Sequence, residues 1–254
     1  MSAVLLHVDG LVKRFGGLTA TDHVHIEVRT GEVHALIGPN GAGKTTLIHQ
    51  ISGAIAPDKG RIRFDGVDVT ELPIHRRVLF GLARSYQITS VFKRLSVLDN
   101  VALAVQACDG RGRRFWRAAS AERARYDEAA GVAERVGLGG RLGHVAGLLA
   151  HGEQRQLEVG LALATRPKLV LLDEPMAGMG PDESERMVAL LQSLRGAATL
   201  LLVEHDMNAV FRLADRVSTL VSGKVIACGT SDEIRNHPEV KRAYLGDEAE
   251  EAAA

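Results

Sequence analysis

The sequence has few cysteines, no net charge and no long apolar run, and each absence excludes a class of protein. Its 254 residues include two cysteines, Cys108 and Cys228, which are too few for a disulfide framework and lack the spacing of a metal site. This cysteine usage favours a reducing compartment. The 31 basic and 31 acidic side chains balance, so charge gives no reason to expect binding to nucleic acid or to an anionic membrane surface.

The chain also lacks the features of a membrane-inserted or exported protein. No stretch reaches the roughly 18 consecutive apolar residues that a spanning helix needs. The longest candidate region, at about 157–172, is interrupted by Arg166, Pro167 and Lys168. The first ten residues, MSAVLLHVDG, have neither the basic start nor the apolar core of a signal peptide. We therefore expect any role at a membrane to depend on a partner protein.

What the sequence does contain is an alternation of short apolar runs and helical patterns. Strand-like runs occur at 4–8, 23–28, 33–37, 169–172, 199–203 and 217–221, with a hairpin expected around 61–64. Helical patterns occur at 44–53, 183–194 and 207–214. This alternation predicts an α/β fold, in which a mostly parallel sheet has helices on both faces.

The middle and the end of the chain differ from this alternating pattern. The stretch from 96 to 165 is alanine-rich and helical in pattern, which predicts a helical subdomain inserted at about 88–160. The segment 247–254 is acidic and then alanine-rich, and we expect it to be a disordered tail. The remainder, 1–246, is predicted to form a single nucleotide-binding domain.

A glycine-rich segment follows the apolar run at 33–37 and precedes a helical pattern. It matches the phosphate-loop template G-x-x-x-x-G-K-[ST], and it reads Gly38-Pro39-Asn40-Gly41-Ala42-Gly43-Lys44-Thr45-Thr46. Glycines allow the backbone to turn its N–H groups toward phosphate oxygens, and the positive end of the following helix points to the same place. We expect Lys44 to reach the β- and γ-phosphates and the Thr45 hydroxyl to bind Mg²⁺.

Two acids end the apolar run at 169–172. In a parallel sheet, ligands bind beyond the carboxyl ends of the strands, so Asp173 is placed to hold Mg²⁺ and Glu174 to orient or deprotonate an attacking water. His205 follows the run at 199–203 and could hydrogen-bond a γ-phosphate. The alternative is that Asp206 caps a helix and His205 has no role.

Together, these motifs resemble the ABC ATPases over nearly the whole chain. The resemblance implies a P-loop NTPase (RecA-like) core with an antiparallel β subdomain, which binds and hydrolyses ATP with Mg²⁺. Phe15 resembles the aromatic residue that stacks on adenine, with a core phenylalanine as the alternative. Gln87 resembles the Q-loop glutamine, which contacts Mg²⁺ or the attacking water and connects the site to the membrane subunit. Asp173, Glu174 and His205 fall where the family has its Walker B acids and switch histidine.

The signature of that family, Leu-Ser-Gly-Gly-Gln, is altered in this chain. The matching segment is Leu149-Ala150-His151-Gly152-Glu153. Ala150 lacks the hydroxyl that serine would offer to the γ-phosphate of the opposite subunit, and Gly180 stands where the family has an aspartate. The helix after Gly152 can still direct its N-terminus at that phosphate. The expected consequence is a weakened half-site for the partner, with the chain's own site unaffected.

These departures are similar to those of the LivG-like ATP-binding subunits of branched-chain amino acid importers. The matching segments are 14–18, 81–87, 91–98, 173–179, 204–207 and 240–246. The resemblance implies a heterodimer with a second ABC ATPase, membrane permease subunits as partners, and indirect cooperation with a periplasmic solute-binding protein. It places the chain on the cytoplasmic face of the inner membrane.

Several alternative functions remain open from the residues. The chain could power transport of another cargo, such as urea, amides or lipopolysaccharide, with the same ATPase chemistry. It could be a soluble ABC ATPase that acts on DNA or ribosomes, although its neutral charge opposes this. A P-loop kinase, or a nucleotide-binding subunit with little hydrolysis of its own, completes the alternatives.

Overall fold

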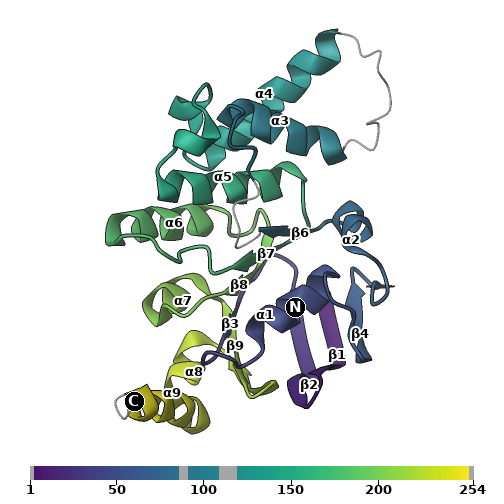
Figure 1. The fold of residues 1–254 in the computed structure, drawn as a ribbon, viewed down its shortest axis with the longest axis vertical. Helices are drawn as coiled ribbons and strands as arrows, with labels where there is room; N and C mark the ends of the chain where they lie inside the picture. The colour runs from purple at the N-terminus through teal and green to yellow at the C-terminus, as the bar shows by residue number, and fades with distance from the viewer. Residues whose placement is uncertain (1–2, 86–90, 109–118, 252–254) are drawn as a thin grey trace. The chain divides into compact units, whose positions relative to one another are not determined.

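The computed structural model describes residues 3–85, 91–108 and 119–251, and these fall into two compact units (Figure 1). Unit 1 comprises residues 1–77, 171–174 and 195–254, and unit 2 comprises 78–170 and 175–194. Gln87 lies outside the described residues. Each unit is described by itself below.

Unit 1 contains a four-stranded antiparallel sheet with the order β2-β1-β4-β5. Its strands are β1 (Val4–Phe15), β2 (Leu18–Arg29), β4 (Lys59–Phe64) and β5 (Val67–Asp68). Strands β1 and β2 form a hairpin in which Phe15 pairs with Leu18. Both strands are longer than the runs predicted at 4–8 and 23–28, because their polar outer positions weaken the apolar signal that marks a strand.

The second sheet of unit 1 is mostly parallel and is centred on β3 (Val33–Ile37). Strand β3 pairs in parallel with β8 (Thr199–Val203) and with β9 (Arg216–Val221). Strand β10 (Lys224–Gly229) is antiparallel to β9, and β7 (Leu169–Asp173) lies next to β8. Every residue of β3, β7 and β8 is buried, which explains their continuous apolar sequences.

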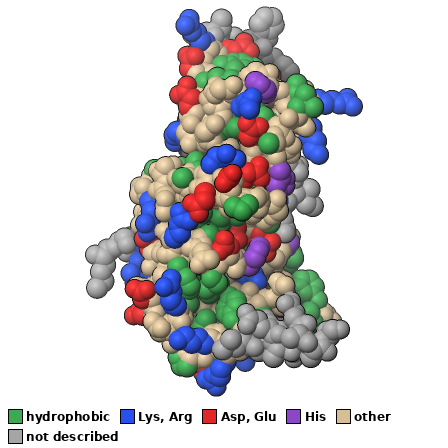
Figure 2. Space-filling model, turned by 90° about the vertical axis from the view of Figure 1, so that its left-hand side faces the viewer, with side chains coloured by type: hydrophobic (Ala, Val, Ile, Leu, Met, Phe, Trp, Pro, Cys, Tyr) green, Lys and Arg blue, Asp and Glu red, His purple; other side chains and the backbone are tan. Residues whose placement is uncertain are grey.

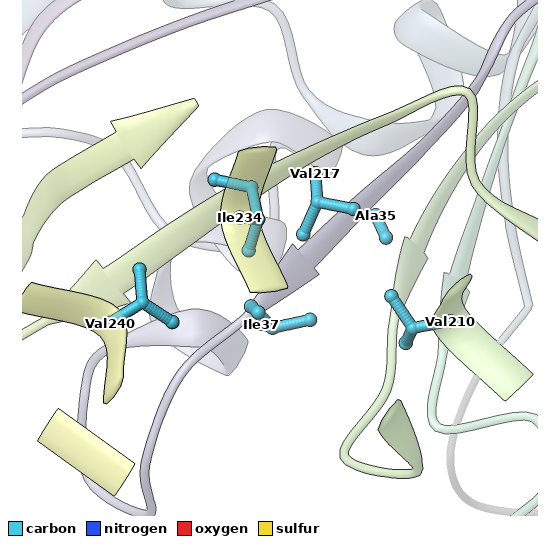
Figure 3. Packing of buried hydrophobic residues seen from close by; sticks show 6 residues of the cluster. All are labelled: Ala35, Ile37, Val210, Val217, Ile234 and Val240. Carbon is cyan, nitrogen blue, oxygen red and sulfur yellow. The ribbon is translucent and has the colours of Figure 1, made fainter. Parts of the chain in front are cut away.

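Helices α1 (Lys44–Ser52), α2 (Ile74–Phe80), α7 (Met207–Leu213), α8 (Ser231–Asn236) and α9 (Pro238–Glu251) accompany these sheets. Around β3, side chains from α7, β9, α8 and α9 point toward one another (Figure 3). This part of the core consists of Ala35, Ile37, Val210, Val217, Ile234 and Val240. The core therefore fixes β3, the strand that leads into the glycine-rich loop.

The C-terminal segment continues helix α9. The helix runs through Gly246 to Glu251, into the segment expected to be a disordered tail, and that expectation stays a prediction. Glutamate and alanine have high helix propensity, and α9 begins at Pro238 and packs against α8 and β10. A helix that is already started in this way extends into such a sequence.

Unit 2 is mostly helical. It contains β6 (Leu82–Ser85), α3 (Val97–Cys108), α4 (Ala119–Arg135), α5 (His151–Ala164) and α6 (Pro181–Ser193), with short 3₁₀ turns η1 (Gly139–Arg141) and η2 (Ala146–Leu148). Helices α3, α4 and α5 pack against one another, and α6 packs on α5. The unit is therefore larger than the insertion predicted at about 88–160, because α6 joins it from beyond β7.

The α/β fold class, with its antiparallel β part and its helical part, is confirmed. Within the described residues, no helix is both long and apolar enough to cross a bilayer. On the face drawn in Figure 2, Lys and Arg side chains are interspersed with Asp and Glu.

Candidate functional site

The glycine-rich loop joins the end of β3 to α1 inside unit 1. Gly38 has a φ of 152° and Gly43 a φ of 102°, values that favour glycine. A Cβ at Gly38 would lie 2.0 Å from the Leu220 carbonyl oxygen, and one at Gly43 would lie 2.1 Å from that of Ala20. The loop backbone packs so closely on its neighbours that no side chain fits at either glycine. No side chain caps the start of α1, so its first N–H groups are available to an anion.

Lys44 is the buried cation of this loop. Its side chain folds back, and Nζ donates to the carbonyl oxygens of Gly38 at 2.5 Å and Pro39 at 2.9 Å. Burial lowers the pKa of Lys44 below its ordinary value, while the charges of Glu174 and Asp173 oppose this shift. The structure thus brings the predicted lysine and the two predicted acids within electrostatic reach of one another.

The two acids occupy the carboxyl end of β7. Asp173 is buried, with 4% of its surface exposed. Glu174 has a positive φ of 49°, and its N–H donates to the Val203 carbonyl oxygen of β8 at 2.9 Å. That hydrogen bond holds the strained backbone of Glu174 at the carboxyl end of the strand. Thr45 is exposed and Thr46 is half-buried in the first turn of α1.

His205 and Asp206 follow β8. The Asp206 carboxylate accepts hydrogen bonds from the N–H groups of Asn208 at 2.9 Å and Ala209 at 3.3 Å. Asp206 therefore caps α7, which is the helix cap considered as an alternative for this segment. His205 has 64% of its side chain exposed, and its Nδ1 lies 3.7 Å from Oε2 of Glu204. Sequence reasoning assigned no role to Glu204, which is 1% exposed; its only signal was an acid directly after an apolar run.

Phe15 ends β1 and is 48% exposed, so the alternative of a core phenylalanine is wrong. Lys13 Nζ lies 5.7 Å from the centroid of the Phe15 ring. The same Lys13 Nζ donates to Asp58 at 2.8 Å, and the Arg14 N–H donates to the other Asp58 oxygen at 2.7 Å. These contacts hold the end of the strand, and about half of Phe15 stays exposed.

The predicted signature segment lies in unit 2, at the start of α5. Leu149 is buried, Ala150 is the N-cap residue, and the Ala150 N–H donates to Glu153 Oε2 at 3.1 Å. Burial alone would raise the pKa of Glu153, but this bond and the Arg141 guanidinium, 2.9 Å from Oε1, lower it overall. Glu153 thus makes one half of a capping box, and Ala150 has no side-chain oxygen for the other half.

The residues of unit 1 fit a nucleoside triphosphate. Glycines that tolerate no Cβ, an uncapped helix start and a buried lysine form a cradle for phosphate. Among the described residues, no cluster of three or more His, Cys, Asp or Glu side chains could hold a metal ion. Mg²⁺ needs few protein ligands when phosphate oxygens supply the others, so Thr45 and Asp173 fit the ion as well.

Comparison with known proteins identifies the family. The family model described as ABC transporter matches residues 21–177. The chain belongs to the ABC transporter family, as an ATP-binding subunit. A second model, described as Branched-chain amino acid ATP-binding cassette transporter, matches residues 224–250. The ABC ATPase domain binds nucleotide, and this chain is homologous to the ATP-hydrolysing subunits of transporters.

Two relatives that match this ABC subunit over their full length are described as branched-chain amino acid transport proteins. BraF of Pseudomonas aeruginosa, a high-affinity branched-chain amino acid transport ATP-binding protein, is 38% identical over 97% of this chain and 100% of its own length. LivG of Escherichia coli, which carries the same description, is 38% identical over the same shares. The solved ADP conformation of MJ1267, an ATP-binding cassette of an ABC transporter, is 28% identical, with a TM-score of 0.83 over 96% of this chain and 100% of that one. The predicted family and branch are confirmed.

Proposed function

We propose that this chain is the ATP-hydrolysing subunit of an importer for branched-chain amino acids or related small solutes. The observation that carries the proposal is its likeness to BraF and LivG over 97% of the chain. The C-terminal match at 224–250 supports the same transport class. The choice of solute would lie with the membrane and solute-binding subunits.

In this function, unit 1 binds ATP. The loop from Gly38 to Thr46 surrounds the phosphates with backbone N–H groups, and Lys44 exchanges its loop carbonyls for β- and γ-phosphate oxygens. Phe15, which is about half exposed, stacks on adenine. Thr45 and Asp173 hold Mg²⁺, with Gln87 as a further ligand. The ion, when bound, neutralises charge that develops on the phosphates.

Hydrolysis is assigned to Glu174. Its carboxylate follows the buried Asp173 at the edge of the sheet, where it can accept a proton from an attacking water. His205 donates a hydrogen bond to the γ-phosphate from its exposed ring. The buried Glu204 carboxylate lies 3.7 Å from Nδ1 of the same ring.

The assembly follows from the family. A second, related ATPase pairs with this chain, and each subunit lends its signature segment, here Leu149 to Glu153, to the nucleotide of the other. The pair binds permease subunits on the inner face of the membrane, and a periplasmic solute-binding protein delivers the solute. Closure of the pair on ATP drives the permeases, and hydrolysis through Glu174 resets it.

The first test is ATP turnover by the purified chain, alone and with its co-encoded ATPase and permeases. We expect turnover to rise with the partners and to fall at least about a hundredfold when Glu174→Gln is combined with a partner ATPase that lacks its own catalytic carboxylate. Glu71→Gln, which alters an exposed carboxylate, should leave turnover unchanged. Turnover that never exceeds that of the Glu174→Gln chain, with ATP still bound, would make this a regulatory subunit.

The cargo is tested separately in liposomes that hold the whole transporter and its solute-binding protein. We expect ATP-dependent uptake of labelled leucine, isoleucine or valine. Uptake of urea or a short amide, with none of the three amino acids, would contradict the proposed solute class while leaving the ATPase assignment intact.

A further inference from the structure

Within unit 2, one carboxylate joins the start of α5 to the start of α6. Glu183 lies in the first turn of α6. Its Oε1 accepts from the Gly152 N–H at 3.2 Å, and its Oε2 accepts from the Gly180 N–H at 3.4 Å. Gly152 is 31 residues earlier in the chain and belongs to the signature segment. Glu183 therefore connects the signature segment to the end of the loop that follows Glu174.

The connection is close at the Gly152 end. A Cβ at Gly152 would lie 2.8 Å from Glu183 Oε1, so a larger residue there would displace the carboxylate. The same loop makes a second contact, because Nε2 of His151 lies 3.3 Å from the Ala177 carbonyl oxygen. The segment from 175 to 180 is thus held to the signature segment at two points.

The charge of Glu183 suits this position. Glu183 accepts hydrogen bonds from two N–H groups that have no acceptor within their own helices. Gly152 is in the first turn of α5, and Gly180 is the N-cap of α6. A carboxylate is stabilised by the positive end of each helix and makes stronger hydrogen bonds than a neutral acceptor. One side chain satisfies two donors that would otherwise depend on water.

The same contact replaces what the sequence has lost. Gly180 has no side chain to anchor the loop, and Ala150 has none to cap α5. Glu183 supplies a carboxylate to both segments: it lies one turn after Gly180 and 31 residues after Gly152 in the chain.

We propose that Glu183 is a positioning residue for ATP hydrolysis at the partner's site. Glu183 holds the signature segment that this chain lends, Leu149 to Glu153, against the loop at 175–180. This inference rests on the proposed pairing of two ATPase subunits. Without Glu183, the lent segment keeps only the His151 contact to this loop, so its position is less well defined and the partner's nucleotide is hydrolysed more slowly.

Amide hydrogen exchange of the purified chain tests the contact independently of activity. In Glu183→Ala, we expect exchange in peptides covering 150–156 and 178–183 to accelerate roughly tenfold or more, since each amide loses its acceptor. Glu183→Gln retains one carbonyl oxygen and should keep protection at one of the two amides. Asp182→Ala removes the neighbouring exposed carboxylate and should leave both peptides unchanged. Unchanged exchange in Glu183→Ala would overturn the proposal.

The role in hydrolysis is tested in the complex with the co-encoded ATPase and permeases. With Glu174→Gln in this chain, turnover comes from the partner's site, which uses the signature segment of this chain. With the catalytic carboxylate of the partner removed instead, turnover comes from the site of this chain. We expect Glu183→Ala to lower kcat at least about fivefold in the first complex, with Glu183→Gln in between, and less than twofold in the second.

Two results would contradict this role. Equal losses in both complexes would indicate general destabilisation, and no loss in the first would exclude positioning. Asp182→Ala should behave like wild type in both. If the unmodified complex hydrolyses no ATP, the proposed function has failed, and the exchange experiment still decides whether Glu183 holds the two segments together.

Discussion

The Lys44 ammonium group donates to the Gly38 carbonyl oxygen at 2.5 Å, so the lysine at the end of the glycine-rich loop is bound to the residue that begins it. Phosphate oxygens would replace this contact with stronger, charged ones. We expect Lys44→Met to weaken ATP binding by about 10- to 100-fold, which corresponds to the roughly 1.5–3 kcal/mol of a charged hydrogen bond. Calorimetric titration with ATP measures this, and Lys224→Met, at an exposed ion pair, is the control. Equal affinities for the Lys44 variant and wild type would remove Lys44 from the site.

Two glycines of the same loop should respond differently to an added methyl group. A Cβ at Gly43 would lie 2.1 Å from the Ala20 carbonyl oxygen, whereas Gly41, with a φ of 76°, has no atom within 4 Å of its would-be Cβ. Gly41→Ala therefore meets only the backbone strain of a positive φ, about 1–2 kcal/mol. Gly43→Ala must in addition displace the backbone, so it should cost more stability in urea unfolding and abolish ATP binding. Similar losses in the two variants would show that the close approach at Gly43 is not limiting.

Arg77 is buried and holds the end of α1. Its guanidinium donates to the carbonyl oxygens of Gln50 and Ile51 in α1, and also to those of Leu72 and Thr70. Burial lowers its pKa to about 10, so it remains charged at neutral pH. We expect Arg77→Met to lower the free energy of unfolding by at least about 3 kcal/mol, because several buried carbonyls lose a charged donor.

The matched control for this prediction is Arg76→Met. Arg76 is the exposed neighbour of Arg77 on the same helix, and its loss should change stability by less than about 0.5 kcal/mol in urea denaturation. If both variants unfold at the same urea concentration, Arg77 does not support α1.

Two glutamates of α5 should give opposite pH dependences of stability. Burial raises the pKa of Glu158 above 4.5, although the Arg155 guanidinium opposes this. The folded chain then keeps a proton that the unfolded chain has released, so stability falls as the pH rises through 4.5 and above. Compared with Glu158→Gln, wild type should therefore gain stability as the pH is lowered toward 4.5.

Glu153 provides the internal control, because its pKa lies below 4.5 in the folded chain. Its contribution is present above 4.5 and disappears as the pH falls through the lowered pKa. Wild type should therefore lose stability relative to Glu153→Gln on acidification. Urea denaturation at a series of pH values measures both differences, and differences of the same sign would contradict the assigned environments.

Sequence reasoning succeeded where the signal is local. The runs at 33–37 and 199–203 agree with β3 and β8 residue for residue, because strands buried on both faces must be apolar throughout. The half-exposed β10, the short helix α2 and the extension of α9 to Glu251 were not predicted. Their polar positions hide the apolar pattern, and packing against other elements decides whether such segments become regular.

The candidate site shows the same division. The phosphate loop and the two acids after β7 could be proposed as site residues because their chemistry and spacing are contained in a few consecutive residues. The role proposed for Glu183 could not be predicted, because this residue accepts a hydrogen bond from Gly152, which is 31 residues away in the chain. The placement of Arg77 against the end of α1, 27 residues away, was equally hidden.

By itself, the sequence determined the fold class and the family, and it supplied the candidate phosphate loop and the candidate acids beyond β7. Motif spacing, backbone preferences and apolar periodicity indicate these features, and each of them acts over a few neighbouring residues. Only the tertiary structure decided that Lys44 is buried on its own loop, that Phe15 is exposed, and that Glu183 joins two helix starts. Burial and hydrogen-bond partners depend on which distant segments pack together, and that is a property of the whole folded chain.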